Sequence, residues 1–257
     1  MNEKCLIALG FELIANKECF SFINKIDGIS DVAERVSNSR DWYVYRGDLI
    51  VSELAKPSFN CGFLILGDFV ITGKKEFSVD DGFSLVVLGN TKIDYLFLEG
   101  ESYLLGNTYF NGYLAARLNV HPRYVKHAVG TYIIRDPHAA LCVGSSKVDF
   151  DINYDDLSFD IIYLIIKNDY IEEYEVDDNE VCYLDVDQDE LLSAIRQNKN
   201  FLVDDAIYLI DEYDKRKKEA NFSSYIKDIE GVKKEFEKNI LLAAEKSGLL
   251  KFQSDWD

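Results

Sequence analysis

The chain has 257 residues, 47% of them hydrophobic, and no stretch approaches the roughly 20 uninterrupted apolar residues that a membrane-spanning helix needs. Its 28 Lys and Arg stand against 46 Asp and Glu, which gives a formal net charge of -18. A field of this sign repels nucleic acid and attracts basic proteins. We therefore expect no membrane segment and no direct DNA or RNA binding, but a basic protein partner.

The first residues indicate the cellular compartment of the protein. Its cysteines and histidines argue against disulfides and metal sites. Met1 to Gly10 lacks a basic segment followed by an apolar run and a cleavage site. The five cysteines include no C-x-x-C pair, and His121, His127 and His138 match no metal-binding spacing. We therefore expect a cytoplasmic protein with no disulfide, no metal and no cofactor.

Residues 1–41 are expected to form a helical N-terminal cap. Apolar residues recur at roughly helical spacing between Glu3 and Ile26, and Ser30 followed by Glu34 indicates a second short helix. These helices would cover the first coil of the repeat that follows, because solenoid ends expose unpaired strands.

Residues 42–150 contain a repeat that predicts the fold. Four segments align on a glycine flanked by alternating apolar residues, and a fifth fits more loosely. The aligned glycines are Gly47, Gly67, Gly89, Gly106 and Gly144. The last interval is twice the usual one, so we expect an additional coil between Tyr113 and Gly130. A parallel β-helix of about five to six coils explains why the same corner returns once per coil, whereas an antiparallel sandwich, the alternative, does not.

Each coil has features expected of a corner and an inward-facing strand. An Asp, Asn or Ser follows each glycine, and such residues hydrogen-bond their own backbone at turns. We expect the glycine to supply a positive φ. The residues expected to point inward, four positions after each glycine, are Val51, Ile71, Ile93, Phe110 and Val148. The glycines expected at a second corner are Gly62, Gly82 and Gly100.

Residues 151–257 are expected to form an acidic, mainly α-helical region. The segment from Asp187 to Asn198 carries Leu191, Leu192 and Ile195 on one helical face, and Tyr225 to Leu242 repeats this pattern. Periodicity leaves Phe159 to Ile166 open as either a buried strand or a helix.

Acidic residues are concentrated between Asp149 and Glu190. This stretch has sixteen carboxylates and one cation, Lys167, so its net charge is -15. Such density is favoured where a cationic partner offsets the repulsion, although it also serves solubility. The predicted partner-binding residues are Asp149, Asp151, Asp155, Asp156, Glu172, Glu173, Glu175, Asp177 and Asp178.

The sequence offers no catalytic motif, so we expect a protein that is not an enzyme. The spacing Asp185-x-Asp187-x-Asp189 resembles the start of a calcium loop, but the glycine and the glutamate that such a loop requires are absent. Paired carboxylates on a solenoid could cleave a polysaccharide, but enzymes of that kind are normally exported.

Four stretches resemble bacterial cytoplasmic β-helix proteins. These are Gly47-Asp-Leu-Ile-Val51, Phe63-Leu-Ile-Leu-Gly67-Asp-Phe-Val-Ile71, Gly106-Asn-Thr-Tyr-Phe-Asn-Gly-Tyr-Leu-Ala-Ala-Arg117 and the Asp187 to Arg196 helix. Members of that group resemble immunity proteins of polymorphic toxin or contact-dependent growth inhibition systems. The resemblance implies a toxin inhibitor, or antitoxin, that binds a cognate basic toxin, and we expect a monomer or a dimer. Nucleases are among the toxins that it could bind. The alternative is a bactofilin-like structural solenoid that self-assembles.

Overall fold

The protein forms two compact units. In the computed structural model they are Met1–Asp155 and Asp156–Asp257. Within them, the structure describes residues 1–15, 40–117, 121, 123–135, 141–153, 165–176, 181–206 and 208. No helix in these ranges is both long and apolar enough to cross a membrane.

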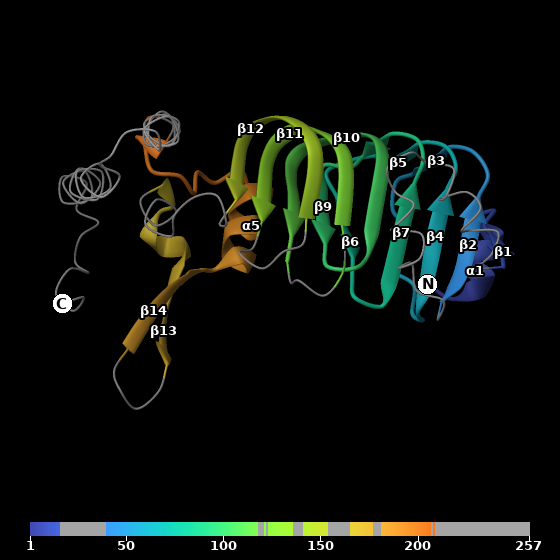
Figure 1. Ribbon diagram of the computed structural model, residues 1–257, viewed down its shortest axis with the longest axis horizontal. Helices are drawn as coiled ribbons and strands as arrows, with labels where there is room; N and C mark the ends of the chain where they lie inside the picture. The colour runs from blue at the N-terminus through green and yellow to red at the C-terminus, as the bar shows by residue number, and fades with distance from the viewer. Residues whose placement is uncertain are drawn as a thin grey trace, which may run out of the picture. The chain divides into compact units, whose positions relative to one another are not determined.

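The first unit is a parallel β-solenoid of about five turns, which confirms the predicted fold (Figure 1). Its short strands lie on three faces, and each strand pairs in parallel with its equivalent in the next turn. The first face has β2 (Asp41–Tyr45), β4 (Cys61–Ile65) and β7 (Phe83–Val87). The second has β3 (Leu49–Val51), β5 (Phe69–Ile71) and β8 (Thr91–Lys92). The third has β6 (Glu76–Val79) and β9 (Tyr95–Leu98).

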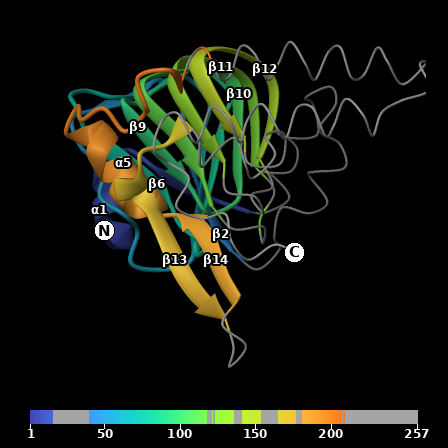
Figure 2. The same ribbon diagram turned by 90° about the vertical axis from the view of Figure 1, so that its left-hand side faces the viewer.

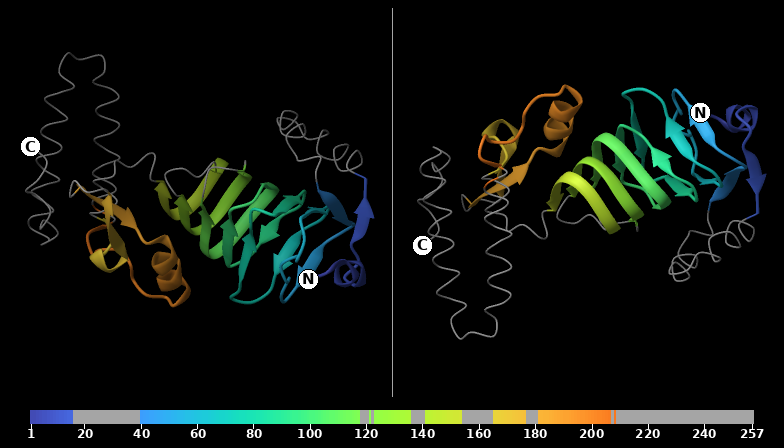
Figure 3. Two further views of the ribbon diagram at one scale, coloured as in Figure 1. Left: turned by 90° about the horizontal axis from the view of Figure 1, so that it is seen from below. Right: turned by 90° about the horizontal axis from the view of Figure 1, so that it is seen from above.

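Three long strands complete the solenoid, and each passes through all three faces. They are β10 (Ser102–Ala116), β11 (Arg123–Arg135) and β12 (Leu141–Asn153). They pair in parallel over nearly their whole lengths, and they run side by side as curved strands in Figure 2. Figure 3 shows the turns stacked in chain order from β2 to β12.

The register explains the doubled interval between Gly106 and Gly144. The additional coil is β11, in which His127 pairs with Asn107 on one side and with Ser145 on the other. A bulge in β10 sets two residues, Leu105 and Gly106, opposite Lys126 alone. The predicted limits of this coil, Tyr113 and Gly130, were both wrong. Lys126 occupies the corner position that is glycine in the other coils, so this coil does not align with them in the sequence.

Close packing of neighbouring turns is the reason for most of the aligned glycines. A Cβ built on Gly67 would lie 2.5 Å from the carbonyl oxygen of Gly47, and one on Gly89 would lie 2.5 Å from that of Gly67. Only Gly47 among the five aligned glycines has a positive φ, at 128°. The expected positive φ was therefore wrong for the other four. These positions need glycine because stacked backbones leave no room for a side chain.

The second set of glycines divides between corners and a strand. Gly82 and Gly100 lie in the turns that lead into β7 and β10, as predicted. Gly62 lies inside β4, and a Cβ there would lie 2.5 Å from the ring of Trp42. The prediction of a corner at Gly62 was wrong, because this glycine makes room for the indole of the preceding turn.

The polar residues after the glycines form a ladder along the corner. The backbone N–H of Asp68 donates to Asp48 Oδ1 (2.8 Å), that of Asn90 to Asp68 Oδ1 (2.7 Å), and that of Asn107 to Asn90 Oδ1 (3.1 Å). These side chains were expected to bond their own turn. They bond the next turn instead, because the equivalent N–H groups lie directly along the stack. The ladder therefore fixes the register between coils.

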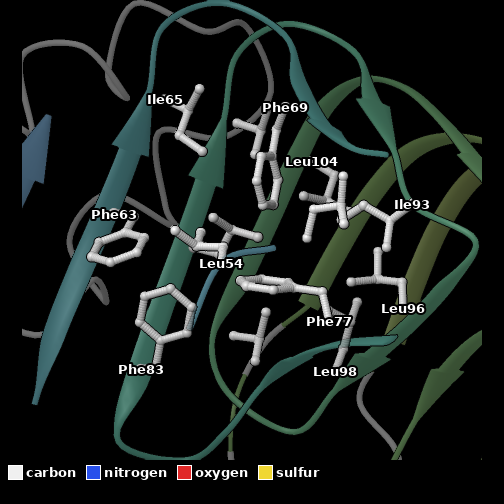
Figure 4. Packing of buried hydrophobic residues seen from close by; sticks show 14 of the residues in the cluster. Leu54, Phe63, Ile65, Phe69, Phe77, Phe83, Ile93, Leu96, Leu98 and Leu104 are labelled. Atoms are coloured by element: carbon white, nitrogen blue, oxygen red, sulfur yellow. The ribbon is translucent and has the colours of Figure 1, made fainter. Parts of the chain in front are cut away.

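The interior of the solenoid is largely apolar and rich in aromatic rings (Figure 4). The rings of Phe63 and Phe83 have centroids 4.7 Å apart, and those of Phe69 and Phe77 are 5.2 Å apart. The predicted inward column is confirmed. Ile71, Ile93 and Phe110 belong to the buried core, and Val51 and Val148 pack against it. The residue before each of these faces outward, and Ile50, for example, is 64% exposed.

The N-terminal cap contains a short helix and a strand. Helix α1 (Glu3–Ala8) buries Leu6, and Phe11 packs on Phe63 with ring centroids 4.6 Å apart. Strand β1 (Glu12–Ile14) pairs antiparallel with β2. The expected continuous helix was wrong here, because pairing with the open edge of β2 satisfies the backbone of this segment. The predicted second helix, near Ser30, lies outside the described residues.

The described part of the second unit contains a hairpin and one helix. The hairpin joins β13 (Ile171–Val176) antiparallel to β14 (Val181–Val186), and a short 3-10 helix, η1 (Asn168–Tyr170), precedes it. Helix α5 (Gln188–Arg196) confirms the predicted helix, and its buried side chains include Leu191, Leu192 and Ile195. The expectation of mainly helical structure missed the hairpin.

Two other predictions for this unit have different outcomes. Ile166, at the end of the segment left open as strand or helix, forms an isolated antiparallel bridge with Leu202. The predicted helix from Tyr225 to Leu242 lies outside the described residues.

Replacing Gly89 with alanine tests the close approach of the corners. We expect Gly89→Ala to lower the free energy of unfolding by about 1–3 kcal/mol, because the added methyl group forces two turns apart. Urea denaturation measures this. Gly144→Ala is the comparison and should cost less, since a Cβ there also meets a backbone atom but at 2.8 Å rather than 2.5 Å. Equal losses in both variants would contradict the explanation.

Removing a step of the corner ladder tests its contribution to stability. We expect Asp68→Ala to destabilise the protein by about 1 kcal/mol, because the partly buried Asn90 N–H loses its acceptor. Asp68→Asn retains an oxygen at this place and should be at least as stable as the parent protein, since it also removes repulsion from Asp48. Thermal unfolding compares the two variants, and indistinguishable midpoints would rule out this role for the ladder.

Candidate functional site

The negative charge of the protein is distributed unevenly between the two units. The first unit has 15 Lys and Arg against 20 Asp and Glu, so its net charge is -5. The second has 13 against 26 in a shorter stretch, so its net charge is -13. Most of the field that would attract a cationic partner therefore originates in the second unit.

The structure divides the predicted partner-binding residues into three groups. Asp149 and Asp151 lie on β12, and both are exposed. Glu172, Glu173 and Glu175 lie on β13. The remaining four, Asp155, Asp156, Asp177 and Asp178, lie outside the described residues.

The two aspartates of β12 have different surroundings. Arg135 Nη2 donates to Asp151 Oδ2 at 2.5 Å, so the charge of Asp151 is offset within the solenoid. Asp149 has no ion pair within the described residues. Of the two, Asp149 is therefore the carboxylate that can receive a cation from outside.

The hairpin of the second unit brings acidic residues into register. Glu172 pairs with Asp185, while Glu173 and Glu175 pair with Leu184 and Cys182. Neither β13 nor β14 contains a lysine or an arginine. Two strands alone form a marginally stable sheet, and like charges in opposite positions weaken it further. The register therefore places two acidic residues, Glu172 and Asp185, opposite each other.

An aromatic pair lies next to Asp149. The rings of Tyr132 and Phe150 are stacked, with centroids 5.5 Å apart and planes at 20°. Burial raises the pKa of Tyr132, and the negative charge of Asp149 raises it further. Both rings are partly exposed. A carboxylate beside an aromatic stack is a suitable environment for a guanidinium or an ammonium group.

A buried polar cluster lies on the first face, and the sequence analysis did not identify it. Ser84 Oγ donates to Glu101 Oε2 (3.0 Å), and the Tyr103 hydroxyl donates to Glu101 Oε1 (3.2 Å). Arg40 donates to Ser84 Oγ (2.7 Å) and to the Asp81 carbonyl (3.3 Å). The Asp81 carboxylate also forms an ion pair with His121.

The cluster has a structural role in this conformation. Glu101 is 3% exposed and Ser84 is fully buried. Burial raises the pKa of Glu101, while the hydrogen bonds from Ser84 and Tyr103 and the charges of Arg40 and His121 oppose this shift. The network joins the entry to β2, the turn before β7 and the start of β10. It therefore fastens a corner, and its central glutamate is hidden from solvent.

The repeat alignment contains a signal for this cluster. The residues five positions before the aligned glycines are Trp42, Gly62, Ser84 and Glu101. In the first two coils this position holds Trp42 and the glycine that makes room for it. Polar residues at the same position in the next two coils, Ser84 and Glu101, indicate a local polar network.

The described residues contain no group of three or more side chains that could hold a metal ion. Asp187, which belongs to the calcium-like spacing, is the N-cap of α5 and accepts a hydrogen bond from the Glu190 N–H at 3.0 Å. This bond satisfies one of the free N–H groups of the first helical turn.

The pH dependence of stability tests the burial of Glu101. Its pKa lies above the ordinary value of 4.5 in the folded protein, so proton uptake favours the folded state. The parent protein should therefore gain stability relative to Glu101→Gln as the pH falls from neutral toward about 4.5. Denaturation at several pH values measures this difference.

Glu53→Gln provides a control of opposite sign. The hydrogen bond from Lys75 lowers the pKa of Glu53, so the parent protein should lose stability relative to Glu53→Gln as the pH falls below 4.5. A pH-independent difference between the parent protein and Glu101→Gln would show that Glu101 is not buried as described.

Comparisons with protein-family models, with curated proteins and with solved structures find no match for this chain. Its function has to be inferred from the fold, the distribution of charge and the local chemistry. These features together describe a solenoid scaffold with an acidic second unit and, on its last turn, an aromatic stack beside an exposed carboxylate.

Proposed function

We propose that the protein is an immunity protein that binds and neutralises a cognate basic toxin domain by covering its active surface. The observation that carries the proposal is the acidity of the second unit, with 13 Lys and Arg against 26 Asp and Glu. The proposed place of action is the cytoplasm. A nuclease is a fitting target, because a surface that binds nucleic acid is basic and would be attracted to this unit.

The acidic hairpin supports a binding role. Its two strands contain Glu172, Glu173, Glu175 and Asp185 and no cation. Acidic residues are depleted in strands, and opposed like charges disfavour pairing. A basic partner would offset this repulsion, so binding and ordering of the hairpin would reinforce each other.

The solenoid supports the same role as a rigid scaffold. Its turns are held in register by the corner ladder, and its interior is closed at the first turn by Leu6 and Phe11. End-to-end assembly, as in the bactofilin-like alternative, requires open strands at both ends. Strand β1 covers the edge of β2, which disfavours such stacking.

Mixing the full chain with the separately purified domain encoded immediately upstream of its gene tests the function. We expect a complex that inhibits the toxicity of that domain and whose affinity falls at least about tenfold between about 0.05 M and about 0.5 M salt. The triple variant Glu172→Gln, Glu173→Gln and Glu175→Gln should weaken binding in low salt by a similar factor. Calorimetry measures both effects.

A variant with the same loss of charge in the first unit is the control. Glu3→Gln, Glu12→Gln and Glu53→Gln removes three exposed carboxylates and should change the affinity much less. Failure of the domain to bind would overturn the function, and binding that ignores salt would remove its electrostatic basis. Particles that grow with concentration in light scattering would favour self-assembly instead.

A further inference from the structure

The two ends of the solenoid differ in how their edge strands are treated. At the first turn, β1 pairs with the outer edge of β2. At the last turn, β12 pairs with β11 on one side, and no strand within the described residues pairs with its other side. A row of backbone N–H and C=O groups along 13 residues is a ready template for another strand.

Among the described residues, nothing pairs with the outer side of β12, and most side chains along it are exposed. Exposed residues on it include Cys142, Ser145, Ser146, Lys147 and Asp149. Ser146 is exposed although its register equivalents Ala128 and Thr108 are buried in the interior. An apolar element of the kind that closes the first turn is therefore not expected here. A polar strand fits this edge better.

The side chains around the edge favour a cation on the third face. Tyr95, Tyr113, Tyr132 and Phe150 occupy one outward column in successive turns. A strand added to β12 would continue this column and place one of its side chains over the Phe150 ring, beside Asp149. Arginine and lysine are favoured at that point, because they stack on aromatic rings and pair with a carboxylate.

The second face disfavours a cation at the same edge. Lys147 is its exposed outward residue on β12, and Lys92 is exposed in the same column three turns earlier. A strand that carried positive charge over Lys147 would be repelled. The edge therefore selects where along an added strand the cation lies.

We propose that β12 receives an extended segment of the basic partner as an added strand, with a cationic side chain of that segment over Phe150 and beside Asp149. Backbone hydrogen bonds would supply affinity, and the aromatic stack with its carboxylate would supply selectivity. This inference rests on the proposed function, because it takes the partner to be a basic protein.

A short synthetic threonine-rich peptide with a single arginine serves as the probe of the edge. Titrated into the isotope-labelled full chain, it should shift the backbone amide resonances of β12 and the ring resonances of Tyr132 and Phe150. The equivalent peptide with glutamate in place of arginine should not. Shifts confined to the second unit would overturn the proposal, because they would reflect general attraction to its negative charge.

Two neighbouring proline variants test the open edge. Successive N–H groups of a strand point to opposite edges, so one of Ser145→Pro and Ser146→Pro removes a donor from the open edge and the other breaks the pairing with β11. The variant that retains the unfolding midpoint of the parent protein should bind the peptide at least about tenfold more weakly. Unchanged binding by that variant would overturn the proposal. Ser145→Ala controls for the hydroxyl contact with His127.

Asp149→Asn tests the selectivity of the edge. It should weaken arginine peptide binding several-fold, whereas Asp41→Asn, which removes an exposed carboxylate on the first turn, should have little effect. Equal effects of these two variants would overturn the assigned role of Asp149.

The experiments separate this inference from the proposed function. If the edge variants bind the upstream domain as tightly as the parent protein does, strand addition at β12 is refuted but the proposed function is retained. If the peptide binds at β12 but the upstream domain forms no complex with the chain, the proposed function is refuted but strand addition at β12 is retained. A parent protein that dimerises, and returns to a monomer in the edge variant, would make a second copy the occupant and overturn the proposal.

Discussion

The structure of the first unit depends on how closely equivalent corners stack. Strands of neighbouring turns lie about 4.8 Å apart, and the corner must keep that spacing while the chain changes direction. At Gly67 and Gly89 the backbones of two turns approach so closely that no Cβ fits. The side chains of Asp48, Asp68 and Asn90 then reach along the stack to the next backbone N–H. Steric exclusion and hydrogen bonding thus act at adjacent residues to set one register.

This register determines what the surface can present. Residues that pair across neighbouring turns form outward rows along the stack, and some of these rows keep one chemical character. The row that ends in Tyr132 and Phe150 is aromatic, while the corner beside the second face is lined with Asx side chains. The interior changes along the same axis. It is aromatic near Phe63, but further along it accepts the buried Arg123 and the Arg135–Asp151 ion pair. The two ends therefore offer different surfaces to other elements.

The parts of the fold that recur could be predicted from the sequence, and the parts that depend on contacts distant in the chain could not. The glycine and Asx corner returns often enough to identify the solenoid. Lys126 at one corner hid a turn, because a bulge in β10 makes glycine unnecessary there. Strand β1 looks helical locally, and only the open edge of β2 makes it a strand. The acidic hairpin was missed because its residues are poor strand formers.

The candidate site shows the same division, and its carboxylates explain why. Acidic composition pointed to Asp149 and Asp151 alike, yet Arg135 offsets the charge of Asp151, while Asp149 has no ion pair within the described residues. Glu101 escaped notice because nothing in its immediate sequence distinguishes it from a surface glutamate. Its hydrogen bonds come from Ser84 in the preceding turn and from Tyr103, so its role exists only in the folded stack. A carboxylate whose partners are supplied by the fold stabilises that fold, whereas one that the fold leaves without a cation is available for recognition. The sequence shows how many carboxylates there are. The register of the strands determines which of them stabilise the fold and which are available for recognition.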